Sequence, residues 1–162
     1  MFTRILRSRL ALVAAGLFLV PAALIAGDRV PVKSSLEGRT LSREIIGDPA
    51  QLGVPFVRVV TEAEGTASHA GRVRILSEYL VHLTIESGVL VAIGEGRYET
   101  TTANGAVWHG VFRLRQVVGQ AAFGFHAEED SGAVLDAVGE SFADGTFHYR
   151  TSGTTANPGR GS

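Results

Sequence analysis

From residue 56 onward, apolar and polar residues alternate along the chain in the period-two pattern typical of β-strands. FVRVVTEAE, from Phe56 to Glu64, alternates and is rich in β-branched residues, so it predicts a strand. RVRILSEYLVHLTIE, residues 72–86, fits helical spacing as well as alternation. We favour a strand here, because the segments on both sides are predicted strands. Three further strand-like runs follow between residues 88 and 130.

Short turn motifs separate these runs. Asn104-Gly105 is a strong hairpin signal, because both central residues of a type I′ turn need positive φ, and Val118-Gly119 marks the next break. Asp144-Gly145 supplies another turn before a closing strand from Phe147 to Thr151. Short strands joined by sequential hairpins predict an all-β fold, a small antiparallel β-barrel of about eight strands, since closure leaves no exposed edge strand.

The segments that flank this pattern are less regular. We predict an irregular lead-in over residues 27–54, in which VPVKSSLEG is the segment suited to a first strand and a single helical turn follows Thr40 or Ser42. The barrel domain is expected to cover residues 55–154. The small and polar residues 155–162 are expected to form a disordered tail.

Residues 1–26 have the features of an export signal. Three arginines and no acidic residue come first, and an apolar run from Leu10 to Ala26 follows, which is short for a membrane-spanning helix. We therefore expect a signal helix that is cleaved after Ala26, and a periplasmic or extracellular protein. Leu24 departs from the small-residue pattern of cleavage sites, so an uncleaved membrane anchor is the alternative.

Composition narrows the chemistry. Removal of residues 1–26 leaves 12 basic and 16 acidic residues, a net charge of −4, and the single lysine is Lys33. Nucleic acid is therefore not an expected partner, because binding it needs clustered Lys and Arg. The absence of cysteine excludes disulfides, zinc–thiolate sites and cysteine nucleophiles. We expect no cofactor, and contact with a membrane only through residues 1–26 if they are retained.

Three segments resemble those of a group of exported bacterial proteins of unassigned function. They are GTASHAGR (65–72), TTANGAVWHGVF (101–112) and SGAVLDAVGES (131–141), which correspond in order to G-x-A-T-H-L-G-R, A-A-N-G-D and G-T-G-R-F-A-x-A-x-G segments. Ser68, Ala106 and residues 133–135 depart from that pattern. The third segment is in turn similar to the plant allene oxide cyclase and dirigent barrels. This resemblance implies an antiparallel barrel around an apolar cavity, and no catalytic residue of those enzymes has a counterpart here.

The histidines are the natural place to look for a metal or an acid–base site. By alternation, three of them lie on strand faces opposite to large aromatic residues, and no H-x-H or H-x-x-x-H pair occurs. We therefore expect solvent-facing histidines and no metal site. The five are His69, His82, His109, His126 and His148.

Other catalytic arrangements fit the sequence poorly. Ser68 and His69 are adjacent, so on a strand they point to opposite sides and cannot act as nucleophile and base. GEGRYE, residues 94–99, is a lone G-x-G with no following helix to bind phosphate. The acidic residues 128–130 are interpreted as the solvated end of a hairpin.

The barrel interior remains as the candidate site. Inward-facing side chains either fill such a lumen or leave room for one small ligand, and a filled lumen is the expected default. If a cavity exists, we expect the ligand to contact one group of residues: Trp108, Phe112, Phe123, Phe125, Tyr98 and His69.

Three functional hypotheses follow. The favoured one is an exported, non-catalytic β-barrel that is structural or binds a small apolar molecule. The second is a cavity enzyme of the cyclase or isomerase kind, in which Glu95, Tyr98 or His126 supplies a polar group. The third is an interaction module tethered to the cell envelope by residues 1–26.

Overall fold

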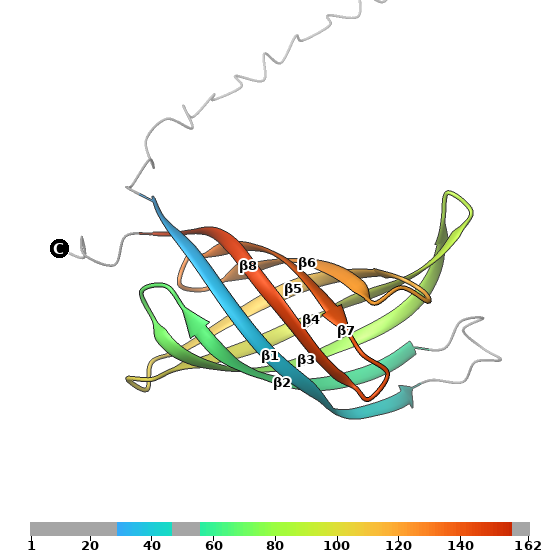
Figure 1. Ribbon diagram of the computed structural model, residues 1–162, viewed down its shortest axis with the longest axis horizontal. Coiled ribbons are helices and arrows are strands. Elements are labelled where there is room, and N and C mark those ends of the chain that lie inside the picture. Colours follow the sequence, from blue (N-terminus) through green and yellow to red (C-terminus); the bar gives the residue numbers. More distant parts are fainter. Residues whose placement is uncertain (1–28, 47–55, 157–162) are drawn as a thin grey trace, which may run out of the picture.

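Eight antiparallel strands form a closed barrel in the computed structural model, which describes residues 29–46 and 56–156 (Figure 1). Each strand pairs with the next along the chain, and the first pairs with the last. The all-β barrel expected from the sequence is confirmed. The signal helix expected over residues 1–26 lies outside the described residues. The strands are β1 (Arg29–Ile46), β2 (Phe56–Ala67), β3 (Gly71–Glu86), β4 (Val89–Thr102), β5 (Val107–Val117), β6 (Ala122–Glu129), β7 (Val134–Ser141) and β8 (Thr146–Ala156).

Strand β1 occupies much of the expected lead-in. It pairs with β2 on one side and with β8 on the other, so that Leu36 lies opposite both Gly65 and Tyr149. The helical turn expected after Thr40 or Ser42 is wrong, because the backbone of this segment is used in strand pairing. Without β1 the edges of β2 and β8 would have no partner.

The predicted hairpins are confirmed. Gly105 and Gly145 have φ of 83° and 85°, in the left-handed region. The type I′ turn expected at Asn104-Gly105 is wrong, because Asn104 does not have positive φ and the Gly105 N–H donates to the Thr102 carbonyl oxygen at 3.0 Å. The ambiguous run over residues 72–86 forms β3 and is a strand, as favoured. Two strands are longer than the sequence indicated: β2 continues through Gly65 to Ala67, and β8 continues past Thr151 to Ala156.

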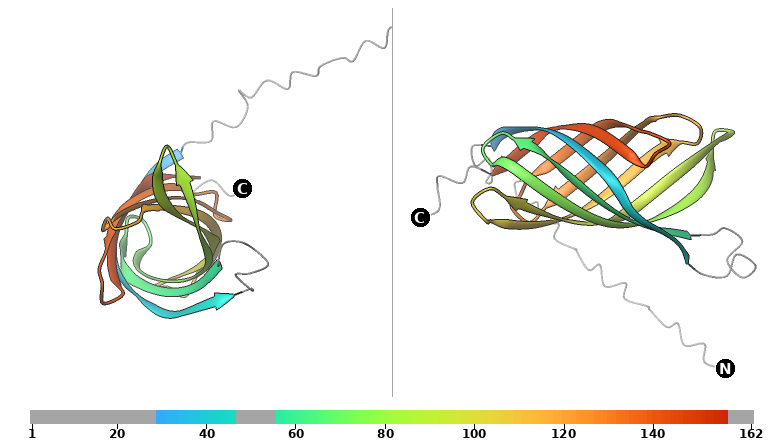
Figure 2. Two further views of the ribbon diagram at one scale, coloured as in Figure 1. Left: turned by 90° about the vertical axis from the view of Figure 1, so that its right-hand side faces the viewer. Right: turned by 60° about the horizontal axis from the view of Figure 1, so that its bottom comes forward.

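Alternation divides each strand between the lumen and solvent. On β2, Val59, Thr61 and Ala63 are buried and face the lumen, whereas Arg58 and Glu64 are exposed. Figure 2 (left) looks roughly along the barrel and shows the strands around this interior. Buried side chains from five strands pack together inside it: Leu36, Ala63, Val73, Ala137 and Tyr149.

The outer face carries cross-strand pairs of opposite charge. Glu62 lies between Arg39, at 3.5 Å, and Arg74. Glu78 lies in the same way between Arg58, at 2.6 Å, and Arg97, at 3.7 Å. Because water and salt screen these exposed charges, each pair contributes little to the stability of the neighbouring strands.

Candidate ligand cavity in the barrel lumen

The lumen contains a cavity of about 810 Å³, and all eight strands contribute to its wall. The filled lumen expected by default is therefore wrong. The lumen is open because several inward-facing residues are small. At these positions larger side chains would fill a barrel of this size: Ala63, Ala92, Ala127 and Ala137. A cavity of this volume is within the range of small-molecule sites.

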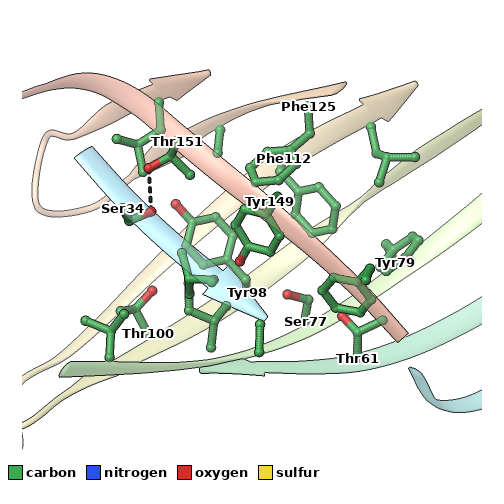
Figure 3. Close-up of a pocket in the computed structure, with 18 of the residues that line it drawn as sticks. Ser34, Thr61, Ser77, Tyr79, Tyr98, Thr100, Phe112, Phe125, Tyr149 and Thr151 are labelled. Carbon is green, nitrogen blue, oxygen red and sulfur yellow. Dashed lines mark hydrogen bonds between the residues drawn. The ribbon is translucent and has the colours of Figure 1, made fainter. Parts of the chain in front are cut away.

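Aromatic rings from several strands form one connected wall of the cavity (Figure 3). Phe112 on β5 contacts Tyr79 on β3, with centroids 5.3 Å apart, and Phe125 on β6, at 5.9 Å. Phe125 contacts Tyr149 on β8 at 5.1 Å. These rings meet edge to face, which is a favourable arrangement of their quadrupoles. The result is a rigid apolar surface against which a flat or branched molecule can pack.

Polar groups interrupt this wall at a few positions. Thr61, Thr100 and Thr151 are buried on the lumen side. The hydroxyls of Ser34 and Thr151 are 2.6 Å apart and form a hydrogen bond, which Figure 3 marks. Such hydroxyls can orient a ligand by donating or accepting hydrogen bonds, and they add no charge to the cavity.

One carboxyl group lies in the lumen wall. Glu129 accepts a hydrogen bond from the Ser131 hydroxyl at 2.6 Å and a longer one from the Thr100 hydroxyl at 3.4 Å. Burial raises the pKa of Glu129, and the negative charge of Asp130 adds to the rise, whereas the two hydroxyl donors lower it. The carboxyl thus keeps its proton to a higher pH than an exposed glutamate does.

The phenol of Tyr98 lies beside this carboxyl. Its hydroxyl is buried and makes no hydrogen bond within the part of the chain that the structure describes. Burial raises the pKa of Tyr98, and so does the nearby charge of Glu129. A buried hydroxyl without a partner is costly, so a hydrogen-bond acceptor on a bound molecule would relieve that cost.

All six residues expected to contact a ligand line the cavity: Trp108, Phe112, Phe123, Phe125, Tyr98 and His69. Of the three polar groups proposed for a cavity enzyme, only Tyr98 lies there. Glu95 pairs with Arg113 on the outer face at 3.3 Å, and His126 pairs with Asp136 there at 2.8 Å. Strand pairing places both side chains on the opposite side of the sheet from the lumen.

Glu129 and Arg43 are two charged lumen residues that the sequence analysis does not predict. The prediction that residues 128–130 are the solvated end of a hairpin is wrong for Glu129, because this residue lines the cavity. The alternation along β6 could have revealed this, because every second residue of a strand points to the same face. The alternate residues of β6 that line the cavity are Phe123, Phe125, Ala127 and Glu129. Arg43 also lines the cavity. Unbroken alternation from Leu36 and Thr40 would place it on the outer face, but the pairing of β1 with β2 shifts by one residue between Thr40 and Ser42.

His69 lies in the tight turn between β2 and β3. It has φ of 69°, and its ring donates to the Pro31 carbonyl oxygen through Nε2 at 3.2 Å. The neighbouring Ser68 hydroxyl accepts a hydrogen bond from the backbone N–H of Lys33 at 2.9 Å. Both side chains thus fasten the turn to the start of β1, at one end of the cavity.

Three other histidines lie on the outer face, as expected. His109 is 3.4 Å from Glu99, His126 is 2.8 Å from Asp136, and His148 is 3.9 Å from Glu140. Among the residues that the structure describes, no three potential ligands gather as a metal site would require. In the same part of the chain, no helix is long and apolar enough to cross a membrane.

Comparison of the chain with models of protein families, with curated proteins and with solved structures gives no match.

Proposed function

We propose that this protein binds one small apolar molecule in the lumen of its barrel and acts by holding it rather than by converting it. The observation that carries the proposal is the cavity of about 810 Å³ with a connected aromatic wall. Transfer of an apolar surface from water to such a wall is favourable by about 25 cal/mol per Å². A preformed cavity adds to the affinity because little has to be ordered on binding.

The proposal is tested with N-phenyl-1-naphthylamine, an uncharged dye whose fluorescence rises in apolar surroundings. Ser77 lies on the lumen side of β3, and Leu76 beside it is 46% exposed on the outer side. Ser77→Phe fills part of the cavity, whereas Leu76→Phe adds a comparable ring outside it. We expect saturable binding to the wild type and to Leu76→Phe, and loss of binding in Ser77→Phe. Equal binding by the two variants would show that the dye sits elsewhere.

A second candidate function is favoured by Glu129. A carboxyl whose pKa is raised, next to the buried hydroxyl of Tyr98, is the kind of group that moves a proton within an apolar ligand. Isomerisation of 3-cyclohexenone to its conjugated isomer is a direct probe, because a base removes the proton between the carbonyl and the double bond and returns it at the far carbon. Acceleration by the wild type that Glu129→Gln removes would support an isomerase. No acceleration over buffer, or an equal rate with Glu129→Gln, would leave the binding function alone.

We also propose that the protein is exported, on the strength of the arginine-bearing and apolar residues 1–26. Fractionation of cells followed by sequencing of the mature N-terminus tests this. A soluble exported protein that begins at Gly27 or Asp28 is the expected result. An intact N-terminus in the membrane fraction would instead support a tethered module.

A further inference from the structure

A β-bulge in β1 changes which residues face the lumen. Thr40 pairs with Thr61, but the next pair joins Ser42 to Val60, so Leu41 has no partner in β2. Such an extra residue reverses the alternation of the strand. Even-numbered residues face the lumen before the bulge, and odd-numbered residues face it afterwards.

The bulge places Arg43 in the lumen wall. Arg43 pairs with the buried Val59, lines the cavity and is exposed at its mouth. It is the only arginine or lysine among the described residues of the lining. Its charge acts on Tyr79, which pairs with the same Val59 from the other side: burial raises the pKa of this phenol, and Arg43 lowers it in part.

The arginines of the outer face have a different environment. Arg113 is 3.3 Å from Glu95, and Arg115 is 2.8 Å from Glu86. Within residues 29–46 and 56–156, no carboxylate lies within ion-pair distance of Arg43. Glu129, the carboxyl of the lumen, is next to the β6–β7 hairpin, at the opposite end of the barrel from the last residues of β1. The mouth at Arg43 therefore offers a positive charge beside an apolar wall.

Apolar surface continues outward from this mouth. Beyond Tyr79, the lumen face of β3 continues through Leu83 and Ile85, and Ile85 pairs with Leu90 of β4. Ile85 is 73% exposed and Leu90 is 43% exposed. The β3–β4 hairpin projects past the other strands at the end of the barrel where β1 also ends (Figure 1). A molecule that enters at this end would first contact the exposed apolar side chains of Ile85 and Leu90. It would then pass the Arg43 guanidinium and reach the aromatic residues of the lumen.

We propose that the lumen selects apolar molecules that carry one anionic group, a carboxylate or a sulfonate, and that Arg43 binds this group at the mouth while the apolar body lies among the rings. The inference rests on the proposed binding function. It adds a ligand class and an orientation. A guanidinium suits this role because it stays charged and donates two parallel hydrogen bonds to a carboxylate or sulfonate.

The test uses two dyes that share one aromatic skeleton. N-phenyl-1-naphthylamine is neutral, and 1-anilinonaphthalene-8-sulfonate is the same molecule with a sulfonate. We expect the sulfonate dye to bind the wild type about fivefold to tenfold more tightly than the neutral dye, as a partly exposed charge pair allows, and high salt to reduce that preference. Arg43→Gln should weaken binding of the sulfonate dye more than binding of the neutral dye, so that the preference is lost.

Arg39→Gln is the matched control, because Arg39 lies on the same strand but faces outward and pairs with Glu62. It should leave both affinities as they are. If both dyes bind equally to the wild type, or if Arg43→Gln weakens both alike, the inference about the anion is overturned and the binding function stands. If neither dye binds the wild type, the binding function fails and the inference fails with it.

Discussion

Aromatic side chains in the lumen lie over glycines of neighbouring strands. A Cβ added at Gly94 would come within 3.0 Å of the Tyr79 ring, and one at Gly110 within 2.4 Å of the Tyr98 ring. Gly38 stands in the same relation to the ring of Phe147. These glycines weaken strands when considered alone, but here they give the rings room to lie flat against the wall. The shape of the cavity thus depends on glycine and aromatic pairs.

Gly96 lies against the backbone of β3, and Gly96→Ala tests how closely β3 and β4 approach each other beside these rings. The new methyl would meet the Glu78 carbonyl oxygen at 2.2 Å, and backbone cannot move aside as a flexible side chain can. We expect the free energy of unfolding in urea to fall by roughly 3 kcal/mol. Gly124→Ala is the control, since its methyl would meet only the Ala137 carbonyl oxygen at 3.4 Å, and it should change stability by less than about 1 kcal/mol. Equal losses in the two variants would contradict the packing account.

Glu129 predicts a pH dependence of stability. Its pKa is raised in the folded protein, so the folded state holds the proton more tightly than the unfolded state, whose ordinary value is 4.5. Stability from this group therefore falls as the pH rises from about that value through the raised pKa of the folded state. Glu129→Gln should be more stable than the wild type at pH 7, and this difference should vanish near pH 4. Thermal unfolding at both pH values measures it, and a gain that is the same at both would refute the assignment.

At the scale of single elements, the β3–β4 hairpin turns on Ser87 and Gly88, whose φ values are 50° and 81°. Serine adopts this conformation at a cost that asparagine largely avoids, whereas glycine adopts it freely. Ser87→Asn should raise the free energy of unfolding by about 0.5 kcal/mol. Gly88→Ala should lower it by about 1 to 2 kcal/mol, although open space surrounds that position. Chemical denaturation of both variants checks the pair, and a stable Gly88→Ala would contradict the turn assignment.

The hairpins could be predicted from the sequence, whereas the bulge in β1 could not. Asn104-Gly105 and Asp144-Gly145 mark hairpins because the chemistry of the turn is local, and alternation then gives the strands between them. The bulge at Leu41 is not marked by a glycine or proline. Its position is set by pairing with β2, which is a long-range contact. For that reason Arg43 could not be placed in the lumen from the order of residues alone.

At the scale of the whole molecule, closure depends on β1, which is hydrogen-bonded to β2 and β8 along most of its length. A chain that begins at residue 47 would leave two long edges unpaired and expose the buried cluster around Leu36. We expect it to lack a cooperative thermal transition by circular dichroism. A chain that begins at residue 28 should unfold cooperatively like the full chain. A cooperative transition in the shorter chain would show that the barrel does not need β1.

The open lumen is also a property of the whole molecule. Parity along β5 and β6 correctly placed Trp108, Phe112, Phe123 and Phe125 on the inward faces. Whether such residues fill the barrel depends on the sum of all inward side chains and on the tilt of the strands. Small residues such as Ala92 lower the total volume of the inward-facing side chains, and no single sequence motif indicates that total.

The most direct test of the central claim locates a bound molecule. Methyl-labelled protein with N-phenyl-1-naphthylamine gives intermolecular nuclear Overhauser effects between the dye and nearby methyl groups. We predict such effects to Val59, Ile75 and Leu114, which line the lumen, and none to Leu76 or Val138 on the outer face. Effects confined to the outer-face methyls, or no saturable effect at all, would contradict a ligand-binding lumen.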